Sequence, residues 1–258
     1  MIANKLIFSK AVCLAVVSIS PFCLSSCSQN EVATPPKPAH PAVGLASRIF
    51  VTEPLMGHPP VSEASRTAIA QAVETLPSQM RKKLDASQAR ITISPNLIDR
   101  WPDAIKNNDL PEDTPALNLA ELPGRIYGQD MNIYERPKLR KTTELGAARP
   151  PQFIKLQALN MCFQVFDDME TISKSPQLRA AHDRDKMALP PELRDKLWTF
   201  CKQDDWGPRE TCAETFAALL GGKDQYSDDL MRYFPNTRDY LEQRLSISPV
   251  GHSQNQTQ

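Results

Sequence analysis

Four polar residues form one stripe on a segment that is otherwise apolar. Gln157, Asn160, Gln164 and Asp167 are spaced by three, four and three residues, which places them on one face of a helix. A helix that is apolar nearly all round is normally central to its fold, so such a stripe faces either solvent or an internal cleft. In a cleft, its amides and carboxylate could hold a peptide by hydrogen bonds. By composition alone, a solvated face is the commoner explanation.

A second pair of polar residues has the same helical spacing. Glu210 and Glu214 are four residues apart and share one face, while Cys212 and Phe216 can pack elsewhere. Two carboxylates at this spacing could serve as metal ligands. Taken alone, the spacing is also typical of a solvated helix face.

The two stripes require two buried helices, and the pattern around them predicts an α+β fold that is mostly helical. Phe153–Met169 is the apolar helix, preceded by Pro150 and Pro151, and another helix opens at Pro208 and stops at Gly221-Gly222. The first half of the chain predicts a small strand and hairpin region, and the second half is helical. The elements expected in the first half are a helix over 61–76, a strand over 90–94 and a β-hairpin over 124–134.

Five short motifs occur in an order that resembles a known family, the anthrax lethal-factor-like metallopeptidase domain, which has a zincin-type fold. The resemblance covers roughly Leu76 to Leu245. Its motifs are a Gly-x-x-Tyr hairpin, a central helix whose H-E-x-x-H is followed by an acid, a Ser-Pro-x-Leu helix start, a glutamate helix and a closing Phe-Pro-x-Thr with an aromatic residue. The matching segments are 124–127, 160–167, 175–178, 210–217 and 234–240.

The departures from that family decide the expected chemistry. In H-E-x-x-H, two histidines bind zinc and the glutamate acts as general base on a zinc-bound water. The histidine positions here are Asn160 and Gln164, and the base position is Met161. Only Glu210 keeps the residue of the third ligand position, with Glu214 behind it. We therefore predict a degenerate cleft formed by these five residues, with no catalytic residue, no metal and no cofactor, zinc included.

No other set of residues rebuilds a catalytic site in the sequence. Of the four histidines, His182 is expected to be solvated on a helix surface, and the other three fall in loops or in the terminal segments. Cys162 is expected to be an inert core thiol because its helix is apolar.

The amino terminus resembles a bacterial lipoprotein signal. A positive start and a short apolar run lead to Leu24-Ser25-Ser26-Cys27, which resembles a lipobox with Cys27 as the lipidated residue. The predicted organisation is a signal peptide over 1–26, a Pro-rich tether over 27–46, one globular zincin-like domain over 47–245 and a disordered tail over 246–258. The expected location is the cell envelope, at the outer membrane if the cell is Gram-negative, because Ser28 is not an aspartate.

Three cysteines remain in the predicted domain: Cys162, Cys201 and Cys212. Three pairings are possible, and the one between Cys201 and Cys212 is favoured, since it closes a loop between two predicted helices. In the chain-entropy model such a short loop contributes roughly 3 kcal/mol.

Composition limits the partners, and three functions remain open. Thirty basic and thirty acidic residues balance, which argues against nucleic acid as a partner. The first hypothesis is a lipid-anchored pseudo-metallopeptidase that binds a peptide or an envelope protein. The second is an active zinc metallopeptidase with Glu210, Glu214 and Asp167 as unusual ligands. The third is a helical envelope lipoprotein for assembly or adhesion, unrelated to peptidases.

Overall fold

The computed structural model of the protein describes residues 44–102, 121–139, 142 and 144–247. The predicted signal peptide, the lipidation site Cys27 and most of the predicted tether and tail lie outside these residues. The described fold begins with η1 (Leu45–Arg48), where Leu45 is buried, so the core starts inside the predicted tether. Among the described helices, none is both long and apolar enough to span a bilayer.

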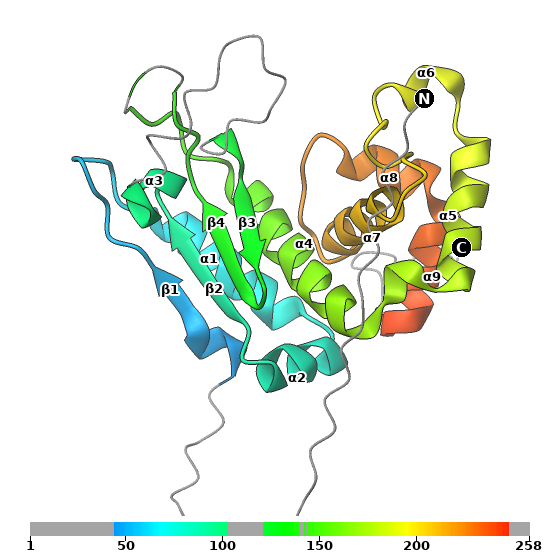
Figure 1. Ribbon diagram of the computed structural model, residues 1–258, viewed down its shortest axis with the longest axis horizontal. Coiled ribbons are helices and arrows are strands. Elements are labelled where there is room, and N and C mark those ends of the chain that lie inside the picture. Colours follow the sequence, from blue (N-terminus) through cyan, green and yellow to red (C-terminus); the bar gives the residue numbers. More distant parts are fainter. Residues whose placement is uncertain (1–43, 103–120, 140–141, 143, 248–258) are drawn as a thin grey trace, which may run out of the picture. The chain divides into compact units, whose positions relative to one another are not determined.

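A four-stranded mixed sheet forms one part of the fold (Figure 1). Its strand order is β1-β2-β4-β3; β2 pairs in parallel with both β1 and β4, and β3 pairs antiparallel with β4. The predicted strand and hairpin are therefore confirmed, whereas β1 was not predicted because three residues are too few to show an alternating pattern. The strands are β1 (Ile49–Val51), β2 (Arg90–Ser94), β3 (Gly124–Tyr127) and β4 (Asp130–Tyr134).

One face of the sheet packs on helices. In the register of β2 and β4, Ile91 lies opposite Met131 and Ile93 opposite Ile133, and all four are buried in the main core. Alternate residues of a strand share a face, so these side chains form one apolar layer. In Figure 1, α1 lies behind the sheet, α4 runs from behind β3, and α2 lies at the lower end of the sheet. Their bounds are α1 (Glu63–Thr75), α2 (Ser78–Ala86) and α4 (Pro151–Glu170).

The second half of the described chain is helical, as predicted. Within it α7 packs along α4, and a second, smaller apolar cluster joins the segment after α6 to α8. The fold is therefore α+β and mostly helical. The remaining elements are α3 (Leu97–Arg100), η4 (Ile172–Lys174), α5 (Pro176–Ala188), α6 (Pro191–Arg194), α7 (Trp206–Leu219), α8 (Ser227–Tyr233) and α9 (Pro235–Leu245).

Two of the family-like motifs hold helices α5 and α9 together. Ser175 caps α5 through a hydrogen bond from the Leu178 amide, and its Oγ lies 3.0 Å from the Tyr240 hydroxyl on α9. The buried carboxylate of Asp185 on α5 accepts hydrogen bonds from the backbone amides of Asn236 and Thr237, at the start of α9. The Ser-Pro-x-Leu and Phe-Pro-x-Thr motifs therefore position helices.

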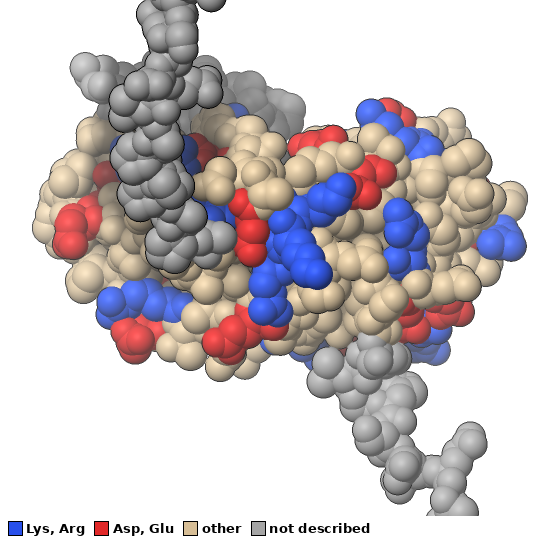
Figure 2. Space-filling view, turned by 90° about the horizontal axis from the view of Figure 1, so that it is seen from below, with Lys and Arg blue, Asp and Glu red and all other residues tan. Residues whose placement is uncertain are grey.

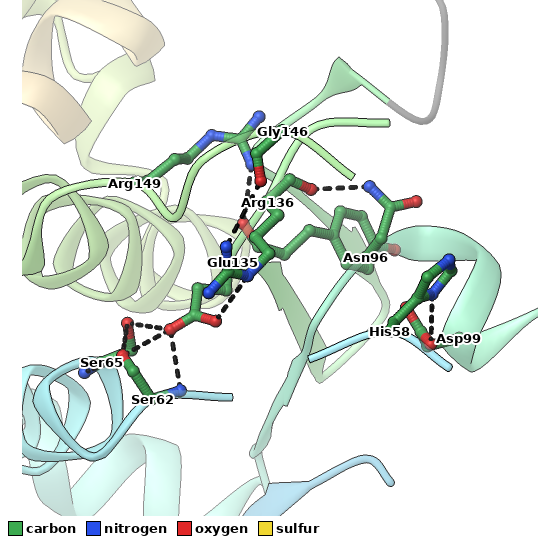
Figure 3. A network of polar contacts seen from close by, with 10 residues as sticks. His58, Ser62, Ser65, Asn96, Asp99, Glu135, Arg136, Gly146 and Arg149 are labelled. Carbon is green, nitrogen blue, oxygen red and sulfur yellow. Dashed lines mark hydrogen bonds and ion pairs between the residues drawn. The ribbon is translucent and has the colours of Figure 1, made fainter. Parts of the chain in front are cut away.

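A buried glutamate joins α1 to the end of β4 (Figure 3). Glu135 is fully buried, and its Oε1 accepts hydrogen bonds from the Ser62 amide, the Ser62 hydroxyl and the Ser65 hydroxyl. Arg149 donates its backbone amide to the Glu135 carbonyl and its guanidinium to the Tyr134 carbonyl. These contacts fix the segment that leads from the sheet into α4.

Gly124, the first residue of β3, allows a close approach between the hairpin and α4. A Cβ added there would lie 2.3 Å from Cε of Met161 and 2.4 Å from the Asn132 carbonyl oxygen. Because the second contact is with backbone, we expect Gly124→Ala to lower the free energy of unfolding by about 2 kcal/mol, as overpacking does. Urea denaturation measures this. Gly44→Ala is the control, since its Cβ would make only ordinary contacts of 3.6 Å or more; equal stability loss in both variants would contradict the prediction.

Charges of both signs are mixed on the surface. On the face shown in Figure 2, lysine and arginine side chains lie beside aspartate and glutamate side chains, and no broad area of one sign is seen. Equal numbers of basic and acidic residues are expected to give such a surface.

Candidate functional site

The two helices expected to carry the site lie against each other. The α7 helix ends at Leu219, and Gly221 adopts φ +83, a left-handed conformation that favours glycine. At Gly222 an added Cβ would lie 2.6 Å from Cα of Leu156, so the chain after α7 passes directly over α4. The glycine pair predicted as a helix stop therefore also sets how closely the two helices approach.

The structure brings the four polar residues of the predicted cleft together. Asn160 Nδ2 donates a hydrogen bond to Glu214 Oε2 at 2.7 Å. Gln164 Nε2 donates to Asn160 Oδ1 at 2.8 Å and lies 3.3 Å from Glu210 Oε1. We call Asn160, Gln164, Glu210 and Glu214 the amide–carboxyl network. Each contact between α4 and α7 in this network is a hydrogen bond from a neutral amide to a carboxyl oxygen.

The fifth predicted residue, Met161, packs under the hairpin. Its side chain is buried at 5% exposure, and its methyl group lies where a side chain on Gly124 would be. A thioether cannot accept a proton from water at any accessible pH. The residue that the motif resemblance aligns with a general base is therefore an apolar group that helps to hold β3 against α4.

Two cavities meet at the amide–carboxyl network. The first, of about 700 Å³, runs between β3 and the helices and is lined by Gly124, Arg125, Ile126 and the network; we call it the strand-side cleft. The second, of about 790 Å³, lies between the start of α4 and the segment after α7; we call it the aromatic pocket. Gln157, Glu210 and Glu214 line both cavities. Gln157, from the predicted stripe, thus stands at their junction.

The fourth member of the predicted stripe, Asp167, does not join the site. Its carboxylate is buried and accepts hydrogen bonds from the amide and hydroxyl of Ser173. These bonds hold the turn after α4, where Thr171 has φ 54. The alternative ligand set of Glu210, Glu214 and Asp167 is therefore wrong, because Asp167 faces the η4 turn and its oxygens already have donors.

Burial makes the two glutamates poor anions. The pKa of Glu210 is raised because burial removes water from its carboxylate. The pKa of Glu214 is raised well above its usual value of 4.5, first by burial and then by the carboxylate of Asp224, to which it is hydrogen-bonded. Both causes favour the protonated form of Glu214 more than in a free glutamate.

These raised pKa values predict that stability depends on pH. A carboxyl with a raised folded pKa binds its proton more tightly in the folded state, so its contribution is complete below pH 4.5 and is lost as pH rises through the folded pKa. We expect the melting temperature to fall from pH 5 to pH 8. Glu214→Gln, which mimics the neutral acid, should reduce that fall, whereas Glu74→Gln on the exposed face of α1 should not. A Glu214→Gln profile that parallels wild type would contradict this.

The residues at the family's metal position do not fit zinc. Zinc in proteins takes imidazole nitrogen, thiolate or carboxylate ligands, and the site offers two amides and one carboxyl whose pKa is raised by burial. Both amides already donate hydrogen bonds within the network. In the part of the chain that the structure describes, no group of three or more His, Cys, Asp or Glu residues is placed to hold a metal ion.

The predicted Cys201–Cys212 disulfide does not hold in this structure, where Cys162, Cys201 and Cys212 are free thiols. Cys212 is buried in the main core, while Cys201 packs against the smaller cluster, so their side chains belong to different apolar regions. Cys162 is fully buried, and burial raises its thiol pKa to about 12, as expected for an inert core residue.

His182 is buried, contrary to the prediction of a solvated histidine. Its Nε2 lies 2.8 Å from the Phe200 carbonyl, and its ring lies 5.8 Å from that of Phe234. Burial lowers the pKa of His182, so the neutral ring is favoured. This histidine positions the segment after α6 and lies apart from the amide–carboxyl network.

Comparison with known proteins agrees with this geometry. A mixed sheet, a central helix under its hairpin and a glutamate helix beside that helix make a metallopeptidase-like fold. A solved structure with this fold is that of the Pro-Pro endopeptidase PPEP-2 from Paenibacillus alvei, with a TM-score of 0.51 and 14% sequence identity over 78% of this chain and 98% of that chain. At this identity the similarity establishes the fold alone. No protein-family model and no curated protein matches the sequence.

Some residues of the site were not predicted from the sequence. Asp224 and the aromatic side chains Phe153, Phe200 and Tyr226 line the aromatic pocket. They come from three separate segments and share no spacing pattern that a single sequence reveals. Trp206, half exposed at the start of α7, lines the strand-side cleft. The sequence indicated a place for Trp206 in the site only by its closeness to Glu210 along the chain.

Proposed function

We propose that this protein is a catalytically degenerate metallopeptidase homologue that binds peptides in the strand-side cleft without cleaving them. The observation that carries the proposal is the amide–carboxyl network, in which hydrogen bonds between amides and carboxyls join the residues that the motif resemblance assigns to a zinc site. Met161 supports it, because no proton acceptor stands at the base position. An enzyme of this family would need both a metal and a base.

The edge strand supports a peptide as the ligand. Among the strands that the structure describes, β3 is at the edge of the sheet and pairs with β4 alone, and it forms one wall of the strand-side cleft. An edge strand presents unpaired amides and carbonyls, to which an extended peptide can add as a further strand. Amides of Gln157, Asn160 and Gln164 face the same cleft and can bond to a peptide backbone.

Peptide binding tests this proposal. The assay is fluorescence anisotropy with a panel of labelled extended peptides, including peptides with consecutive prolines, because the structurally similar protein is named a Pro-Pro endopeptidase. Gln157→Trp should fill the junction of the two cavities and weaken binding at least about tenfold. Gln177→Trp, on the exposed face of α5, is the matched control and should bind as wild type.

Two outcomes would overturn the proposal. One is that no peptide in the panel binds, or that Gln157→Trp and Gln177→Trp bind equally well. The other is that mass spectrometry finds bound peptides cleaved by a clean preparation, with cleavage lost in Glu210→Gln; this result would restore the enzyme hypothesis. Peptides recovered intact after long incubation agree with a binding function.

We further propose that the protein is anchored in the cell envelope by lipid on Cys27, at the outer membrane in a Gram-negative cell. The support is the sequence alone, since Leu24-Ser25-Ser26-Cys27 follows a short apolar run. Labelling cells with a radioactive fatty acid tests the anchor. We expect incorporation in wild type and none in Cys27→Ala; equal incorporation in both would refute lipidation at Cys27.

A further inference from the structure

The aromatic pocket has apolar walls from separate parts of the chain. Phe153 comes from the start of α4, Phe200 from the segment before α7, and Tyr226 from the segment before α8. The rings of Phe200 and Tyr226 meet edge to face, with centroids 5.5 Å apart. Because Gln157, Glu210 and Glu214 line both the pocket and the strand-side cleft, the two cavities are adjacent, and a side chain of a peptide in the cleft would pass these three residues to enter the pocket.

The inner wall of this pocket is acidic. Glu210, Glu214 and Asp224 all line it. The donors to the two glutamates are the neutral amides of Gln164 and Asn160, and Asp224 Oδ1 accepts from the Tyr226 and Ser227 amides and the Ser227 hydroxyl. Among the described residues, none of these hydrogen bonds comes from a cationic side chain.

The two lysines that line the pocket are bound elsewhere. Lys196 forms an ion pair with Asp229, and Lys223 lies 3.1 Å from Asp228. Neither aspartate lines the pocket. The lysine charges are therefore matched by carboxylates outside the pocket. Arg209 and Lys202 act on Glu210 and lower its pKa, but neither of them lines the pocket.

We propose that the aromatic pocket binds a lysine or arginine side chain of the peptide held in the strand-side cleft. Aromatic and proline walls suit the aliphatic stem of such a residue and, through their ring faces, its charged end. Glu210 and Glu214 then meet the cation at the inner wall. Buried carboxyls close together disfavour ionisation, and an incoming cation relieves that cost. The proposal rests on the peptide-binding function above and specifies which peptides bind.

The test compares three peptides that differ at one position and are measured against the full chain. The variable residue is lysine, norleucine or glutamate; norleucine keeps the stem of lysine without its charge. The position is first found by scanning a binding peptide with lysine. We expect lysine to bind at least about tenfold more tightly than norleucine, and glutamate more weakly than both. The lysine advantage should shrink between 50 mM and 500 mM salt, as charge screening increases.

Variants locate the preference in the pocket. Glu210→Gln/Glu214→Gln should lower affinity for the lysine peptide about tenfold more than affinity for the norleucine peptide, so that the lysine preference is lost. Glu192→Gln, on the exposed face of α6, is the control and should keep the lysine preference. The comparison of the lysine and norleucine peptides uses the wild-type protein, so it tests the preference for a basic side chain even if the double variant does not fold.

The outcomes separate this inference from the proposed function. If lysine confers no advantage over norleucine at any scanned position, the basic-residue inference is wrong, while peptide binding itself stands. If the lysine advantage persists unchanged in Glu210→Gln/Glu214→Gln, the preference arises elsewhere and the pocket assignment is wrong. If no peptide binds at all, both the proposed function and the inference fail.

Discussion

Asn160→His, Met161→Glu and Gln164→His made together are expected to raise the affinity of this protein for zinc by about a thousandfold or more. The two amides already lie on one face of α4, at i and i+4, where imidazoles of a zinc site belong. Gln164 Nε2 lies 3.3 Å from Glu210 Oε1, so the third ligand is within reach. Two amides, which are weak zinc ligands, would be replaced by two imidazoles, which are good ones. Even residues that only hydrogen-bond to zinc ligands change zinc affinity by roughly 10–100-fold.

Glutamate at position 161 has room in the triple variant. Met161 is nearly as long as a glutamate, and its side chain already reaches the strand-side cleft beneath Gly124. A carboxylate at this position would supply the proton acceptor that Met161 lacks. The zinc gain itself does not require peptidase activity, so metal content and activity are separate measurements.

Titration calorimetry and metal analysis of purified protein measure the gain. The control adds Glu210→Gln to the triple variant, which removes the third ligand and should abolish most of the gained affinity. A triple variant that folds like wild type, judged by circular dichroism, but binds no more zinc would show that these three positions do not form a metal-site geometry. The degenerate-site assignment would then lose its basis.

Asp185→Ala is expected to lower the free energy of unfolding by about 3–5 kcal/mol. Asp185 is 1% exposed, and its carboxylate accepts four hydrogen bonds, two from each of Asn236 and Thr237. Removing the carboxylate leaves buried amide donors at the start of α9 without partners, a cost of about 1–3 kcal/mol for each buried group. The charge of Asp185 also interacts favourably with the amino-terminal end of that helix.

Urea denaturation of Asp185→Ala against wild type measures this loss. Asp183→Ala is the control on the same helix, because Asp183 is exposed and pairs with Lys186 at the surface. Its stability should stay within about 0.5 kcal/mol of wild type. If Asp185→Ala is as stable as Asp183→Ala, the hydrogen bonds to α9 contribute little, and the Phe-Pro-x-Thr motif needs another explanation.

Much of the fold could be predicted because its signals are local. Helix starts at Pro151, Pro176 and Pro235 and the stop at Gly221-Gly222 rest on backbone constraints that a few neighbouring residues impose. The hairpin around Gly128 could be predicted for the same reason, because its turn depends on a few neighbouring residues. Burial of individual side chains was predicted less reliably. His182 was expected in solvent because its own segment is polar. In the structure it is covered by Phe200 and Phe234, which come from other segments.

The amino-acid sequence alone determined what chemistry is missing. No arrangement of the chain turns Asn160, Met161 and Gln164 into imidazoles and a base, because a residue's functional groups belong to its covalent structure. The meeting of Asn160 with Glu214, the turning of Asp167 towards Ser173 and the separation of Cys201 from Cys212 were decided only by the tertiary structure. Each depends on how α4, α7 and the loops between them pack, and packing is set by many distant side chains at once.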